Sequence, residues 1–171
     1  MKKVIYVAPH LNGYGIRLKV TPLFPDLVAI DWQLRLISQL NKLGYEVSVK
    51  QHPETKTKMS SYFFQEMGAK EIIGPFEDVI SSDQILIFDS ILTTTYAYSI
   101  LSGNPIVLIN FNFFMLKQYE KDLLLRRIAL IEGSFCKDNR AQINWDELEQ
   151  ALERCLSLND KSYQESLLAK V

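Results

Sequence analysis

Short apolar runs alternate with segments of helical periodicity along most of this chain. The runs are nearly continuous and rich in β-branched residues, as is typical of strands covered on both faces. They cover residues 4–7, 46–49, 71–73, 85–88, 106–109 and 128–131. Strands that alternate with helices favour right-handed βαβ units. The pattern therefore predicts an α/β fold of three layers, in which helices flank a parallel sheet of about six strands.

Residues that begin or end helices bracket the segments between these runs. Asp26 can cap the first helix, and Gly44 supplies its left-handed stop. The next two helices are expected over residues 60–67 and 94–102, each followed by a glycine. Asn144 opens a capping-box pattern before the last long helix, and the tail has room for another short one.

Two stretches depart from this rhythm. The connection over residues 9–25 holds two glycines and three prolines and is unusually long, which indicates a functional loop or disorder. Residues 110–125 gather several aromatic side chains. They either pack in the core or form a surface for another domain or chain.

Composition narrows the function classes. With 171 residues, 47% of them hydrophobic, the chain can bury one full core, so a single domain over residues 1–171 is expected. The formal net charge is -1 and the charges are spread along the chain, which argues against nucleic acid as a partner. Cys136 and Cys155 fit neither a CxxC pair nor a metal spacing, so they are expected to be reduced thiols.

The compartment follows from missing signals. The apolar run over residues 4–8 is too short for a signal peptide, and no segment approaches the roughly 20 apolar residues of a membrane helix. We therefore expect a cytoplasmic protein that meets a membrane only peripherally, through a partner.

Candidate chemistry lies in the loops that follow the strands, because ligands of open parallel sheets bind outside the carboxyl ends. After the first strand, Asn12 and Gly13 belong to a glycine-containing loop that either approaches a phosphate or makes a plain turn. After the second, His52 is held by Pro53, so that it either reaches a diphosphate or sugar hydroxyl or packs at the sheet edge.

The loop after the fourth strand is rich in hydroxyl groups. Ser90 is followed by Thr93, Thr94 and Thr95 at the start of a helix. One threonine can cap the helix, and the others, with the free amides of the first turn, either bind phosphate or are ordinary β-branched residues.

Several catalytic motifs are missing from the chain. There is no Gly-x-Ser-x-Gly elbow, no HExxH and no Asp-x-Asp of the kind that holds a cation in metal-dependent sugar transferases. We therefore expect neither a metal nor another cofactor. Histidine acid–base chemistry would be confined to His10 and His52, the two histidines of the chain.

Taken in order, these segments resemble a known family. Lys-x-His-Pro-Glu is followed by Gly-Pro-Phe-Glu-Asp, Ser-Ser-Asp, Asp-Ser, Thr-Thr-Thr and Gly-Asn-Pro-Ile-Val. The set resembles the C-terminal domain of GT-B glycosyltransferases, particularly bacterial capsule and surface-polysaccharide transferases and CDP-glycerol glycerophosphotransferase-like proteins. The similarity covers roughly residues 3–131.

The resemblance implies a Rossmann-like domain that binds a nucleotide-activated donor without a metal. It places His52 near the donor phosphates and the hydroxyl-rich turn, Ser90 and Thr93 to Thr95, against the diphosphate. The segment 74–78, which includes Phe76, would border the nucleobase. Many relatives hold the ribose with a glutamate five residues before Gly-x-Pro, and here that position is Tyr98.

The function expected from this resemblance is binding of a nucleotide sugar, or a nucleotide-activated polyol phosphate, in bacterial surface-polysaccharide biosynthesis. GT-B enzymes use two such domains, so a transferase would need an acceptor-binding domain or partner chain. The alternative is a non-catalytic GT-B-like interaction module in a polysaccharide-assembly complex. An epimerase or hydrolase of similar architecture is a third option, but it normally needs more acid–base groups than this chain offers.

Overall fold

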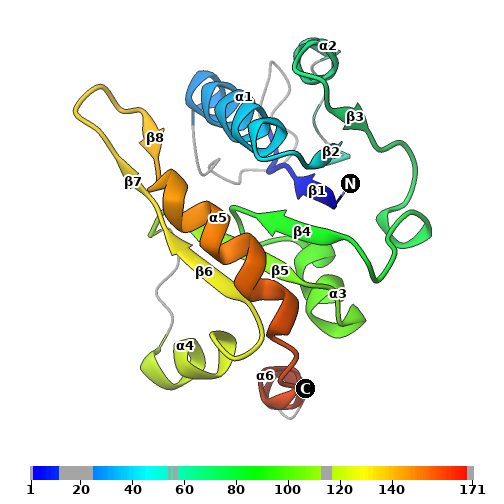
Figure 1. The fold of residues 1–171 in the computed structure, drawn as a ribbon, viewed down its shortest axis with the longest axis vertical. Helices are drawn as coiled ribbons and strands as arrows, with labels where there is room; N and C mark the ends of the chain where they lie inside the picture. The colour runs from blue at the N-terminus through cyan, green and yellow to red at the C-terminus, as the bar shows by residue number, and fades with distance from the viewer. Residues whose placement is uncertain (1, 12–24, 54, 56–57, 113–116, 169–171) are drawn as a thin grey trace.

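A computed structural model gives the fold of the chain (Figure 1) and describes residues 2–11, 25–53, 55, 58–112 and 117–168. A six-stranded sheet runs through the centre, in the order β3-β2-β1-β4-β5-β6, and all its neighbours pair in parallel. Its strands are β1 (Lys3–Val7), β2 (Glu46–Lys50), β3 (Lys70–Glu71), β4 (Ile85–Phe88), β5 (Ile106–Asn110) and β6 (Ala129–Glu132). The predicted α/β class is confirmed, and the strand order is that of the Rossmann fold.

Helices cover both faces of this sheet. They are α1 (Asp26–Lys42), α2 (Lys58–Glu66), α3 (Thr94–Ser102), α4 (Gln118–Leu124), α5 (Trp145–Arg154) and α6 (Ser162–Leu168), with 3-10 turns η1 (Phe76–Asp78) and η2 (Cys155–Ser157). The apolar sides of α1, α2 and α5 belong to one buried cluster, and those of α3, α4 and α6 to the other. Figure 1 shows α1 and α5 lying across the same face.

The two clusters exist because successive side chains of a strand point to opposite faces. In β1, Val4 and Tyr6 pack under α1, whereas Ile5 and Val7 pack under α3. A strand buried on both sides must be apolar at nearly every position, which explains the continuous apolar runs.

Most predicted boundaries agree with the structure within a few residues. The helix predicted over residues 94–102 is α3 as found, and Gly103 ends it at φ 81°. Gly44 ends α1 in the left-handed conformation, as predicted. The prediction that Asp26 caps α1 is wrong, because Pro25 holds the N-cap position and Asp26 is the first helical residue. There the carboxylate still favours the positive end of the helix dipole.

A small hairpin was not predicted. Strands β7 (Ser134–Phe135) and β8 (Ala141–Gln142) pair antiparallel directly after β6, and Figure 1 shows them extending past the sheet beside α1. Each has only two residues, too few for a periodicity to be visible. Among the described helices, none combines the length and the apolar character that a membrane crossing requires.

Gly133, between β6 and β7, permits a close ring contact that gives a first prediction. A Cβ at this position would lie 2.5 Å from both Cδ1 and Cε1 of Phe111, whose ring is buried against Trp32. Because the Phe111 ring also packs against Trp32 and Phe135, we expect Gly133→Ala to lower the free energy of unfolding by about 1–3 kcal/mol in urea denaturation. The exposed neighbour Ser134→Ala is the control, and equal stability of the two variants would contradict the prediction.

Candidate functional site

The strand order fixes one position in the sheet where the connections diverge. From β1 the chain builds outward to β2 and β3 on one side, and from β4 to β5 and β6 on the other. The reversal lies between β1 and β4, which is where open α/β sheets bind ligands at the carboxyl ends. The loops after β2 and β4 leave the same edge on either side of β1, two strand spacings or about 10 Å apart.

The loops after β1 and β2 are joined to each other. Ala8 N donates to the Lys50 carbonyl at 2.9 Å, and Leu11 N donates to Thr55 Oγ1 at 3.3 Å. Between these bonds the rings of His10 and His52 meet edge to face, with centroids 5.2 Å apart and planes at 67°. The two histidines of the chain therefore form one pair at the carboxyl edge of the sheet, which is the edge where the parallel strands end.

The four hydroxyl-bearing residues of the loop after β4 differ in burial and in hydrogen bonding. Ser90 is buried, and its Oγ accepts a hydrogen bond from Leu92 N at 3.1 Å. Thr93 is the N-cap of α3, where its Oγ1 accepts from Tyr96 N at 3.0 Å. Thr94 is exposed and Thr95 is half-buried. One threonine thus caps the helix, and the exposed hydroxyl stands beside first-turn amides that have no partner within a helix.

Asp89, the first residue after β4, is the main feature that the sequence did not indicate as a site. It is 2% exposed, and its Oδ2 accepts from Tyr6 Oη at 2.6 Å and from Trp32 Nε1 at 3.1 Å. Its Oδ1 is buried and has no hydrogen-bond partner among the described residues. Burial raises the pKa of Asp89 to about 6, and burial together with Asp89 raises the pKa of Tyr6 well above its ordinary value.

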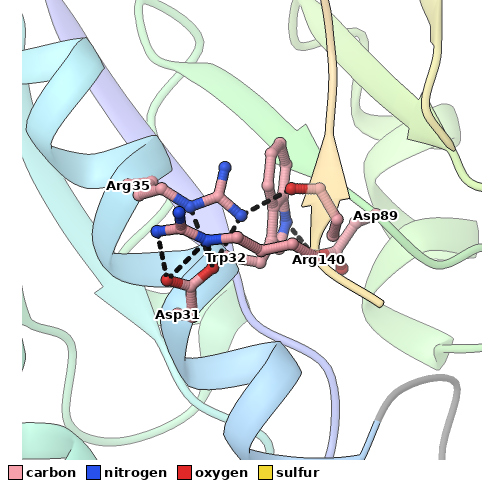
Figure 2. A network of polar contacts seen from close by, with 6 residues as sticks. Asp31, Trp32, Arg35, Asp89 and Arg140 are labelled. Atoms are coloured by element: carbon pink, nitrogen blue, oxygen red, sulfur yellow. Dashed lines mark hydrogen bonds and ion pairs between the residues drawn. The ribbon is translucent and has the colours of Figure 1, made fainter. Parts of the chain in front are cut away.

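A polar network connects this carboxylate to the hairpin (Figure 2). Trp32, which bonds Asp89, lies under the guanidinium of Arg35, 5.7 Å from the ring centroid. Arg35 bonds Asp31 at 2.7 Å and the carbonyl of Ala141, while Arg140 bonds Asp31 at 2.8 Å. The hydrogen bond from Arg140, followed by those from Arg35, lowers the pKa of Asp31. Through these contacts, helix α1 is joined both to Asp89 at the carboxyl edge and to the β7–β8 hairpin.

The remaining predicted positions are less favourably placed. Asn12 and Gly13 lie outside the described residues. Phe76 begins η1 and is 3% exposed, with its ring edge-on to Tyr98 at 6.4 Å, so a ligand in the present conformation could meet only its backbone. Tyr98 itself is partly exposed.

Other places on the molecule offer less chemistry. In the described ranges, no three His, Cys, Asp or Glu side chains gather in an arrangement that could hold a metal ion. A polar cavity of about 190 Å³ opens at the amino ends of β1 and β2, on the edge opposite the histidine pair. It is lined by Lys2, Leu43, Gly44, Tyr45, Glu149 and Glu153. We favour the carboxyl edge, because the strand reversal and the histidine pair both lie there.

Comparisons with known proteins add no family to this picture. No protein-family model matches the chain, and no curated protein matches it. Its functional interpretation therefore depends on the geometry of the carboxyl edge.

Proposed function

We propose that the chain binds a nucleotide-activated sugar or polyol phosphate and is the donor-binding part of a GT-B-type glycosyltransferase in bacterial surface-polysaccharide biosynthesis. One observation supports this more than any other. The histidine pair and the hydroxyl-rich start of α3 flank the strand reversal at one edge of a Rossmann-type sheet. Such an edge suits a ligand with a phosphate group at its centre.

Each group has a part in this proposal. The amides that open α3 and the exposed hydroxyl of Thr94 would donate hydrogen bonds to one phosphate from the β4 side, and His52 would donate to it from the β2 side. During transfer of a sugar, the acceptor oxygen bonds the anomeric carbon while the carbon–oxygen bond to the diphosphate breaks. The leaving diphosphate keeps the electron pair, and donors fixed beforehand stabilise its charge. The acceptor and the base that takes its proton would come from an acceptor-binding domain or partner chain.

Calorimetric titration with UDP-, CDP- and GDP-linked donors and with CMP tests donor binding. We expect one nucleotide to bind, and Thr94→Val and His52→Ala each to weaken it about tenfold, because each removes a hydrogen bond to a charged group. Tyr45→Phe, in the cavity on the opposite edge, is the matched control and should bind like the unaltered protein. Loss of binding in that control, or no binding of any nucleotide by folded protein, would refute the proposal.

A second function, a non-catalytic interaction module, is favoured by a different observation. Tyr98 stands where GT-B relatives carry the ribose-binding glutamate, and its ring packs on Phe76. Two exposed apolar residues, Ile73 and Leu92, lie in loops of the same edge. If the chain is only a scaffold, Thr94→Val and His52→Ala leave the activity of the assembled complex unchanged.

A further inference from the structure

The loops that carry His10 and His52 are joined by two hydrogen bonds from backbone amides. The two loops are held together below the rings by Ala8 N to the Lys50 carbonyl and beyond them by Leu11 N to Thr55 Oγ1. The loop after β2 is further closed by Thr55 N, which donates to the His52 carbonyl at 2.9 Å. The relative position of the two imidazoles is therefore set by the fold before any ligand arrives.

The ring of His10 has a polar atom that its packing does not explain. His10 Nδ1 is buried without a hydrogen-bond partner among the described residues, although His10 as a whole is half-buried. A purely structural aromatic contact would be made equally well by a ring without nitrogen, because a buried polar atom without a partner costs stability. Because Nδ1 is out of a ligand's reach in this conformation, a histidine at this place is better explained if its other ring nitrogen, Nε2, binds a ligand from the accessible side of the half-buried ring.

We propose that His10 is a further ligand-binding residue, which acts together with His52 as a pair on one phosphate group. This inference rests on the function proposed above and adds His10 to its site. Phosphate offers several acceptor oxygens on one centre, so two imidazole donors from neighbouring loops can bond the same group. Because the loops fix both rings, binding loses little side-chain entropy, and the pair is expected to act as a unit.

The test uses variants that keep the rings and remove their nitrogens. His10→Phe, His52→Phe and the double variant are titrated, in EDTA, with whichever of UDP, CDP and GDP binds best, and with the corresponding nucleoside. We expect each single variant to bind the diphosphate about tenfold more weakly and the double variant to lose less than the product of the two losses. The nucleoside, which carries no phosphate, should bind all variants alike.

Stability provides a second readout on the same variants. His10→Phe should unfold at the same temperature as the unaltered protein or a higher one, because the Nδ1 that it removes makes no hydrogen bond within the described chain. Tyr45→Phe, in the cavity on the opposite edge of the sheet, is again the control for binding.

The outcomes separate this inference from the proposed function. Unchanged diphosphate affinity in His10→Phe, with weakened affinity in His52→Phe, would overturn the inference and leave donor binding intact. If the loss of diphosphate affinity in the double variant equals the product of the two single losses, the two histidines act independently and do not bind one phosphate as a pair. If no nucleotide binds the unaltered chain, the proposed function fails, and the inference fails with it.

Discussion

Replacing Trp32 by alanine is expected to lower the free energy of unfolding by about 3–5 kcal/mol, the range for a fully buried aromatic side chain. Trp32 is 0% exposed. Its ring stacks on Trp145 at 5.8 Å and meets the edge of Phe111 at 5.0 Å, and its Nε1 donates to Asp89. The substitution thus removes an apolar side chain that joins α1, α5 and Phe111, the residue that follows β5. It also removes one of the two side-chain donors to the buried Asp89 carboxylate.

Two further variants separate these contributions in urea denaturation. Trp32→Phe keeps a ring and deletes the donor to Asp89, so we expect a smaller loss of about 1–3 kcal/mol. Leu27→Ala, on the same helix but 83% exposed, should change stability by less than about 0.5 kcal/mol. A loss in Trp32→Ala no larger than in Leu27→Ala would contradict the central position given to this indole.

Stability should depend on pH through Asp89. Its pKa is raised from 3.8 to about 6 in the folded protein, chiefly by burial, so the folded state keeps the proton where the unfolded state has lost it. The contribution of Asp89 is therefore fully present below pH 4 and is lost as the pH rises to about 6. At about 1.4 kcal/mol for each pKa unit, the ionisation of Asp89 should lower the free energy of unfolding by about 2 kcal/mol between pH 4 and 7.

Asp89→Asn isolates this dependence, because it removes the titration and keeps the shape of the side chain. Unfolding free energies of both proteins are measured at pH 4, 5, 6 and 7 and subtracted. Carboxylates with lowered pKa, such as Asp31, respond in the opposite direction but cancel in the difference. A difference that stays constant over this range would show that Asp89 ionises alike in the folded and unfolded states.

Both residues lie beneath the proposed site. Asp89 immediately precedes the hydroxyl-rich loop, and Trp32 connects it to the Asp31, Arg35 and Arg140 network of the hairpin (Figure 2). Changes at either residue are therefore expected to disturb the carboxyl edge as well as stability. This is why the binding tests use residues at the rim, His10, His52 and Thr94.

Much of the fold could be predicted because its signals are local. Thr93 lies directly before α3 and Gly103 directly after it, so each end of the helix is marked by a neighbouring residue. In the structure, Thr93 caps the helix and Gly103 ends it in the left-handed conformation. The strand predicted over residues 71–73 is shorter as found, Lys70–Glu71, and Ile73 is exposed. A strand at the edge of a sheet has one pairing neighbour, so its apolar run extends beyond its hydrogen bonds.

The site could be predicted only in outline. Parallel strands bring their carboxyl ends to one edge, so the loops of His52 and Thr94 could be assigned to the same side before the structure was known. The contact of His10 with His52 and the bonds of Asp89 could not. Asp89 lies 83 residues from Tyr6 and 57 from Trp32, and no periodic pattern relates side chains at such separations.

The sequence alone determined the alternation of strands and helices, the two-sided burial of the sheet and the loops in which polar chemistry gathers, because hydrophobic periodicity and capping act over a few neighbouring residues. The tertiary structure decided the strand order, the reversal between β1 and β4, the histidine pair and the buried carboxylate. These depend on which distant strands become neighbours, and that choice is made by the packing of the whole core.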